Sequence, residues 1–128
     1  MSNITNILKQ AIDKLLVISE SEYPFKVVTW NCTTLDKITL LKKTGYSKNT
    51  PIEVVKIDSF FKNFVSSEDW YDDEEKANVK KFQNLVNVLK TNLTNIQVYK
   101  IISKEIQVYI VGNTPNGIAG VSTTLVKT

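Results

Sequence analysis

The chain lacks histidine and arginine altogether, and Cys32 is the only cysteine among its 128 residues. Without histidine there is no Ser–His–Asp or Cys–His nucleophilic site, no histidine metal ligand and no imidazole acid or base near neutral pH. Without arginine there is no bidentate guanidinium clamp for phosphate. One cysteine forms neither an internal disulfide nor a four-ligand zinc knot, which fits a reducing compartment. These absences disfavour an enzyme, and no cofactor is expected.

The residues that are present predict one soluble domain over 1–128. All 16 basic residues are lysine, the net charge is +3 and 42% of the residues are apolar, which is enough for a core at this length. The first 19 residues have no basic leader, so a signal peptide is not supported. The uncharged stretch 106–126 contains Pro115 and three glycines, which is typical of a hairpin and not of a membrane span. We therefore expect a cytoplasmic protein without a membrane segment.

Hydrophobic periodicity predicts an α/β protein. Apolar residues at helical spacing predict helices over 4–18, 34–43 and 72–93. The second of these has Ile38 and Leu41 on one side and Gly45 beyond its end. A helical turn capped by Asp58 is predicted to carry Phe60, Phe61 and Phe64. Strands are predicted over 25–30, 52–57, 96–101, 105–111 and 118–125. The apolar runs 26–28, 54–55 and 109–111 do not alternate, which indicates central strands covered on both faces. The resulting architecture is a mixed, mostly antiparallel sheet of about five strands between helical layers.

The stretch Glu68–Glu75 gathers six of the 13 acidic residues into eight positions, together with Trp70 and Tyr71. The rest of the chain carries a charge of +9, from 16 lysines and seven acids. Part of the run is explained by helix capping, because carboxylates in the first turn favour the exposed amides and the positive end of the helix dipole. Capping leaves Glu68, Asp69 and the tryptophan unexplained. An exposed tryptophan among charges is typical of an interface anchor.

Other candidate sites have simpler explanations. Glu20 and Glu22 lie in a second acidic and aromatic segment, 19–25, which reads as a turn; an acid–base pair or an EF-hand would need spacings that the sequence does not show. The glycines of 112–120 lack the lysine and hydroxyl residue of a P-loop, so this segment is predicted to be a hairpin loop. Lysines beside aromatic residues, such as Lys81, fit a solvated helix face, and direct nucleic-acid binding is not expected.

Several strings together resemble the nuclease A inhibitor family almost end to end. They are Ser-Glu-Ser-Glu-Tyr-Pro-Phe at 19–25, Ile-Asp-Ser-Phe-Phe at 57–61, Asp-Trp-Tyr at 69–71, the acidic helix start that follows, Asn-Leu at 92–93, Gln-Val-Tyr at 97–99 and Ala-Gly-Val-Ser-Thr at 119–123. The resemblance implies a three-layer α/β/α sandwich. It also implies a small intracellular protein, monomeric when free and without enzymatic activity, that blocks a nonspecific DNA/RNA nuclease of the ββα-metal type.

The resemblance also implies which residues contact the nuclease. They are Glu20, Asp69, Trp70 and Thr128, and the two acidic segments add Glu22 and Asp72 as candidate contacts. Thr128 matches the terminal threonine that reaches the nuclease's metal centre, so its only metal role would be as a ligand to the partner's Mg²⁺. Two features depart from the family pattern, namely Lys127 in place of an acidic residue and the positive net charge. The alternative is a non-catalytic interaction module whose acidic face serves a different basic partner.

Overall fold

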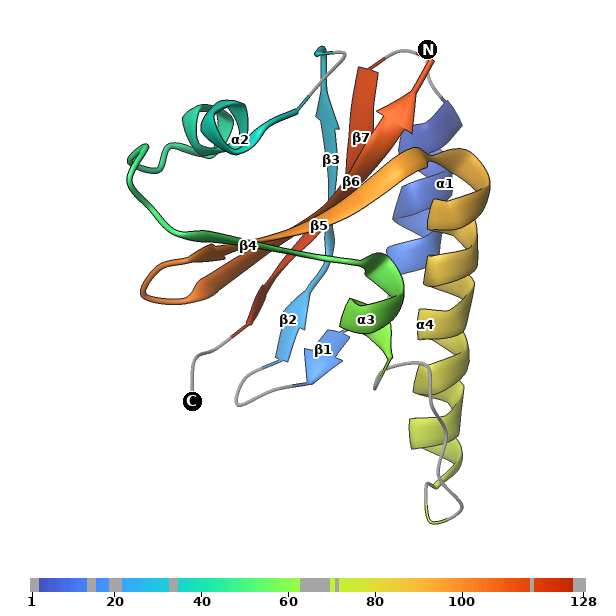
Figure 1. The fold of residues 1–128 in the computed structure, drawn as a ribbon. Coiled ribbons are helices and arrows are strands. Elements are labelled where there is room, and N and C mark those ends of the chain that lie inside the picture. Colours follow the sequence, from blue (N-terminus) through green and yellow to red (C-terminus); the bar gives the residue numbers. More distant parts are fainter. Residues whose placement is uncertain are drawn as a thin grey trace.

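A computed structural model describes residues 3–13, 16–18, 22–32, 35–62, 70, 72–115 and 117–125. Within this part of the chain there are four helices and seven strands (Figure 1). The helices are α1 (Asn3–Ile12), α2 (Lys37–Thr44), α3 (Ile57–Phe61) and α4 (Asp73–Asn92). The strands are β1 (Leu16–Ile18), β2 (Glu22–Pro24), β3 (Lys26–Trp30), β4 (Ile52–Val55), β5 (Thr94–Ile102), β6 (Ile106–Thr114) and β7 (Gly117–Leu125).

The main sheet has five strands in the order β3-β7-β6-β5-β4, and each neighbouring pair is antiparallel. The expectation of a mixed sheet is therefore wrong for the described strands. For β5, β6 and β7 the reason is connectivity, because these strands follow one another as hairpins, whereas parallel neighbours need a long crossover connection. The expected number of strands and the α/β class are confirmed.

The prediction of which strands are central is correct for only one of the three apolar runs. Residues 109–111 lie on β6, the middle strand, where Ile110 and Val111 belong to two different buried clusters. In contrast, β3 and β4 form the two edges, and Val54 is 41% exposed. A short run of valines looks the same in the sequence whether its strand lies at an edge or in the centre of a sheet. Strand order depends on pairing between distant segments, so such a run does not predict it.

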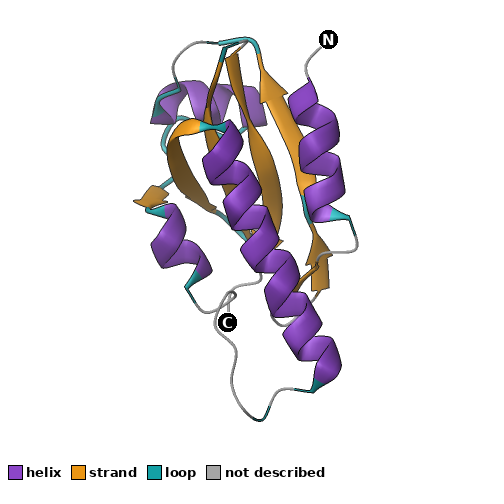
Figure 2. Cartoon of the chain, turned by 90° about the vertical axis from the view of Figure 1, so that its right-hand side faces the viewer, coloured by secondary structure: helices purple, strands orange, loops and turns teal. Residues whose placement is uncertain are grey.

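The larger hydrophobic cluster joins α1, α3 and α4 to one face of the sheet. Its fully buried side chains include Leu8 of α1, Phe61 of α3, and Val98, Val108, Ile110 and Val121 of the sheet, together with Phe82, Leu85 and Leu89 of α4. The ring of Phe82 lies 6.1 Å from that of Phe25 and 6.2 Å from that of Phe61, measured between centroids. Figure 2 shows α1 and α4 beside each other against the strands, in agreement with their direct contact. The long helix is thus confirmed, and its buried face includes Leu85, which the sequence pattern did not single out.

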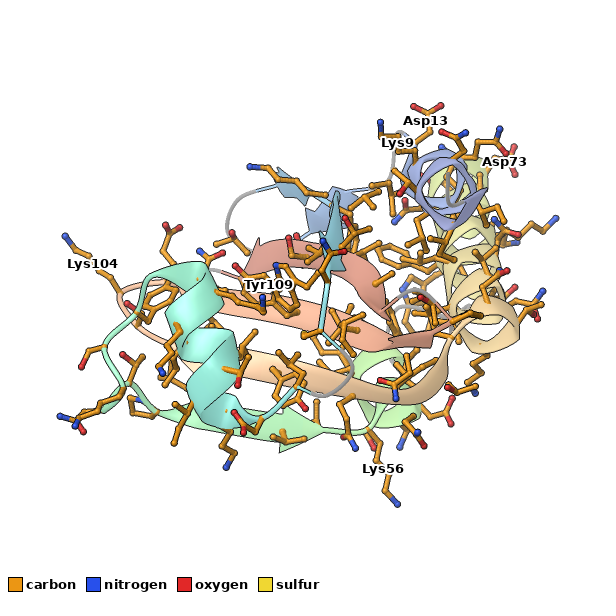
Figure 3. The ribbon with its side chains drawn as sticks, turned by 90° about the horizontal axis from the view of Figure 1, so that it is seen from above. Lys9, Asp13, Lys56, Asp73, Lys104 and Tyr109 are labelled. Carbon is orange, nitrogen blue, oxygen red and sulfur yellow. The ribbon has the colours of Figure 1, made fainter. Side chains whose placement is uncertain are left out.

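A smaller cluster joins α2 to other residues of the sheet, and Figure 3 shows α2 lying across the strands on the side away from α1 and α4. Its buried members are Leu40, Leu41, Tyr99, Ile101, Val111 and Ile118. The carboxylate of Asp36 accepts a 2.7 Å hydrogen bond from the backbone N–H of Thr39 and caps the start of α2. Gly45 ends the helix with φ of 82°, which confirms the predicted stop. Ile38 is 58% exposed, so the prediction that it shares one apolar side of the helix with Leu41 is wrong; Leu40 is buried together with Leu41 instead.

Two predicted elements are shorter than the sequence pattern indicated. The first helix ends at Ile12, and Ile18 lies on β1, which pairs with β2 in a separate two-stranded ribbon. The second predicted strand ends at Val55, because Ile57 begins α3. Asp58 does not cap this helix; its carboxylate forms an ion pair with Lys90 of α4, with an N–O distance of 2.5 Å. Phe64, the last residue predicted for this turn, lies outside the described residues.

The predicted hairpin loop at 112–120 is confirmed as a hairpin but is much shorter. Thr114 pairs with Gly117, so only two residues separate β6 from β7. Gly120 lies inside β7, where an added Cβ would be 1.9 Å from the carbonyl oxygen of Ile110. This glycine therefore allows β6 and β7 to approach closely and does not serve a phosphate-binding loop.

Candidate functional site

Half of the predicted contact residues lie in the described part of the chain. Trp70 and Asp72 are described with their side chains, and Glu22 begins β2. Glu20, Asp69 and Thr128 lie outside the described residues. The candidate site is therefore built from the exposed residues before and at the start of α4 and from the strands that lead to the other candidates.

Trp70 is the most exposed large apolar side chain of the described residues, at 77%. It precedes α4 by three residues and lies next to acidic positions in the sequence. An indole has a large apolar surface and one N–H donor, and leaving it in water forgoes the free energy of burial. This combination is typical of a side chain that becomes buried in a partner.

Asp72 and Asp73 are both exposed at the start of α4. The backbone carbonyl of Asp72 accepts a 3.0 Å hydrogen bond from the N–H of Lys76, so Asp72 stands at the position that opens the helix. Figure 3 shows the Asp73 side chain at the outer edge of the molecule. The predicted helix start is confirmed, and the carboxylates there offset the positive end of the helix dipole. The same placement leaves negative charge available to a cationic partner.

The chain brings the elements that carry these candidates to one end of the molecule. β1 and β2 both contact β7. β3 and β7 are antiparallel, with Trp30 opposite Ile118 and Lys26 opposite Ser122. The start of β3, which follows β2 in the chain, therefore lies toward the end of β7. Figures 1 and 2 place the β1–β2 ribbon, the end of β7 and the start of α4 at the lower end of the molecule. Sequence spacing alone did not reveal this proximity.

The perturbed titratable groups of the described residues lie elsewhere, near α2. The hydrogen bond from Thr39 lowers the pKa of the Asp36 carboxyl. Burial raises the pKa of the Tyr99 hydroxyl, and the negative charge of Asp36 adds to that effect. Burial likewise raises the pKa of Tyr109. These shifts follow from helix capping and core packing, so they do not point to acid–base chemistry at the acidic end.

Metal-ligand clusters and membrane-spanning helices are both absent from the described residues. These residues contain no group of three or more Cys, Asp or Glu side chains arranged to hold a metal ion. None of the helices in the described ranges is long and apolar enough to cross a membrane. Cys32 is half-buried against the smaller hydrophobic cluster, as expected for a small packing residue.

The structure thus defines an α/β protein with an antiparallel five-stranded sheet, four described helices and an exposed tryptophan beside an acidic helix start. The family model described as "Nuclease A inhibitor-like protein" matches residues 2–128. The chain belongs to the nuclease A inhibitor-like family, which confirms the resemblance. Membership implies a nuclease-inhibitor role in general, with a nuclease as partner, and this is a binding role. No curated protein matches the chain.

Proposed function

We propose that this protein inhibits a nonspecific, metal-dependent DNA/RNA endonuclease of the ββα-metal type by occupying its active site. The contact residues are Glu20, Glu22, Asp69, Trp70, Asp72 and Thr128. The observation that carries the proposal is the 77% exposure of Trp70, immediately before an acidic helix start, in a chain of the nuclease A inhibitor-like family. An exposed tryptophan beside negatively charged residues is suited to binding the positively charged groove in which a nuclease holds nucleic acid.

Covalent geometry supports grouping the other candidates with this end. One residue spans at most about 3.6 Å, so Thr128 is within about 11 Å of Leu125, where β7 ends. By the same limit Glu20 is within roughly 7 Å of Glu22, the first residue of β2. Since β2 contacts β7, these two candidates are tethered to neighbouring elements.

The proposed chemistry is substitution of the nucleic-acid phosphate by oxygen atoms of the inhibitor. Mg²⁺ prefers hard oxygen ligands, and a nuclease site that holds a metal-bound phosphate also accepts a hydroxyl or carboxylate oxygen. In this proposal Thr128 supplies an oxygen to the partner's Mg²⁺. Glu20 and Asp69 add negative charge where the phosphates would lie. The inhibitor thereby excludes the substrate without carrying out a reaction.

The acidic end also favours rapid encounter with the nuclease. Asp72 and Asp73 are exposed, and a patch of negative charge steers association with a positive groove more strongly at low ionic strength. Trp70 then supplies apolar burial once the proteins are in contact. Affinity and association rate are therefore assigned to different side chains, which makes the two separable by mutation.

The finer architecture and the state of the free protein belong to the same proposal. We assign α2 and the smaller hydrophobic cluster to the third layer of an α/β/α sandwich, whose sheet holds the acidic end in place. We place the protein in the cytoplasm as a monomer when free, in line with its single half-buried cysteine. Light scattering during size-exclusion chromatography tests the monomer directly.

The test is a titration of a panel of purified ββα-metal nucleases with this protein, with DNA cleavage as the readout. Tight inhibition of at least one member, in proportion to the inhibitor added and saturating at equal molar amounts, is the expected result. An unrelated metal-dependent nuclease of another fold serves as the control and should retain its activity. Unchanged cleavage by the whole panel at excess inhibitor would contradict the proposal.

The positive net charge and Lys127 favour a second candidate, an interaction module for a different basic protein. It keeps the same exposed surface at Trp70 and Asp72 but predicts no nuclease inhibition. Affinity capture from the native host separates the two candidates. Recovery of a basic protein without nuclease activity, lost with Asp72→Lys, would favour the module.

A further inference from the structure

A depression of about 250 Å³ opens beside the segment that leads into α2, away from the acidic end. It lies over β5, β6 and the start of β7. Its lining residues are Leu35, Asn95, Gln97, Tyr99, Val111, Gly112, Asn113 and Ile118. None of these residues is among the proposed nuclease contacts, so the depression is separate from the proposed nuclease-binding site.

A bulge at the start of β5 shapes one wall of this depression. Thr94 pairs with Asn113 and Gln97 with Val111, so three steps along β5 face two steps along β6. Asn95, inside the bulge, has φ of 52°, a left-handed conformation that asparagine adopts more readily than most residues. Bulges re-aim side chains and are common beside binding sites. Here the bulge places Asn95 and Gln97, two residues with carboxamide side chains, in the lining.

The lining combines neutral hydrogen-bonding groups with an apolar floor. Asn95, Gln97 and Asn113 each carry a carboxamide that both donates and accepts hydrogen bonds. Leu35, Val111 and Ile118 supply apolar surface. The Tyr99 hydroxyl donates a long hydrogen bond, 3.4 Å, to the carbonyl oxygen of Leu35 and so holds the wall before α2. No charged side chain lines the depression.

We propose that this depression binds a single neutral, planar heterocycle with hydrogen-bond donor and acceptor groups side by side on its edge, that is, a free nucleobase such as uracil or adenine. Carboxamides pair with two neighbouring groups on the edge of a base, and an aromatic or apolar wall accepts its flat face. These are the groups that the lining brings together from Asn95, Gln97, Tyr99 and Val111. The inference does not depend on nuclease inhibition.

Size and charge restrict the ligand further. At about 250 Å³ the space is smaller than the roughly 300–1,000 Å³ of sites for drug-sized ligands, which favours a base over a nucleotide. The carboxylate of Asp36 lies close enough to Tyr99 to raise the pKa of its hydroxyl beyond the effect of burial. An anionic group such as phosphate would be disfavoured there, which again favours a base over a nucleotide.

The experiment is an NMR titration of the ¹⁵N-labelled protein with uracil and with adenine. We expect saturable shifts, with a dissociation constant on the order of 1 mM, in the backbone amides of 95–99 and 111–113 and in the side-chain amides of Asn95, Gln97 and Asn113. The compound 1,3-dimethyluracil has no N–H donor and should bind about tenfold more weakly. N-methylacetamide tests whether any amide suffices. Equal binding of either compound, or no saturable shift with the bases, overturns the proposal.

Matched variants test the assigned side chains. Gln97→Met keeps the length of the side chain and removes the carboxamide, and Asn95→Gly tolerates the left-handed backbone. Each should weaken base binding about fivefold to tenfold while the spectrum stays that of a folded protein. Gln83→Met on α4 is the control and should bind as the original protein does. Unchanged affinity in both Gln97→Met and Asn95→Gly would overturn the assignment.

Discussion

The two halves of α4 differ sharply in what they contact. From Val79 onward the helix places Phe82, Leu85 and Leu89 in the main core, each at most 1% exposed. Its first turn instead carries exposed Asp72 and Asp73, and the exposed Trp70 precedes it. Figure 1 shows this first part of α4 extending below the sheet. One helix is thus anchored at one half and presents a charged surface at the other.

We infer from this difference that stability and recognition depend on different parts of the helix. The buried half anchors the helix in the core, whereas Asp72 and Asp73 at its start are exposed. A substitution in the buried half should unfold the protein, whereas one in the acidic half should change binding and leave the fold intact. Mutations in the two halves can therefore separate loss of stability from loss of binding.

Phe82→Ala should cost about 3–5 kcal/mol of unfolding free energy, because it leaves a cavity between Phe25, Phe61 and the sheet. Urea denaturation measures the loss. Lys81→Ala, at the next and exposed position, is the control and should change stability by less than about 0.5 kcal/mol. Equal effects of the two variants would refute the role assigned to the buried half.

Trp70→Ala should weaken inhibition by roughly 30-fold, which corresponds to about 2 kcal/mol of binding free energy, because an exposed anchor loses its burial in the partner. Stability should hardly change, since the side chain is 77% exposed in the free protein. Inhibition constants and denaturation curves measured side by side check both statements. Ile38→Ala removes a comparably exposed side chain on α2 and should not affect inhibition. A similar loss with Ile38→Ala would argue against a local site at Trp70.

The sequence predicted much of the fold because its local patterns match the final contacts. The 3.6-residue stripe of α4 and the hairpin strands β5–β7 follow from periodicity and turn residues close in sequence. The order of the strands in the sheet could not be predicted in the same way. The valines of β3 and β4 would give the same sequence pattern in edge strands and in central strands. The short ribbon β1–β2 was also missed, since Ile18 continues the helical spacing of the first helix although it pairs with Glu22.

The candidate site was predictable in its residues but not in its geometry. Trp70 and Asp72 stand out in the sequence because aromatic and acidic residues rarely cluster without a reason. That β2 and the end of β7 are neighbours depends on the β3–β7 pairing, which joins segments nearly 100 residues apart. The depression gave no sequence signal at all, because Asn95 and Asn113 come to line it only through the pairing of β5 with β6.

Reversing both helix-start charges, Asp72→Lys with Asp73→Lys, should slow association with the nuclease by about threefold to tenfold at low salt. The effect should shrink at high salt, because mobile ions screen exposed charges over about 10 Å or less. Stopped-flow binding at two ionic strengths measures it. Glu53→Lys makes the same type of charge change at an exposed position of β4 and should slow association less. A salt-independent loss would mean that these carboxylates act through helix stability.

The smallest effect concerns Asp36, whose carboxyl pKa is lowered from 3.8 by the hydrogen bond from Thr39. A group with a lowered folded-state pKa stabilises the fold fully above its unfolded pKa, and this contribution disappears as the pH falls through the folded value. Asp36→Asn keeps a capping side chain that does not titrate. Its melting temperature should therefore fall slightly less than that of the original protein between pH 6 and pH 2. Parallel melting curves for the two proteins would exclude this role.

Deletion of Thr128 tests most directly whether the protein blocks a nuclease at its metal centre. Inhibition of a responsive ββα-metal nuclease and the melting temperature should be measured on the same preparations of the full chain and the shortened chain. Loss of a metal-directed oxygen should weaken inhibition at least about tenfold and leave the melting temperature unchanged. Full inhibition by the shortened chain would contradict the account.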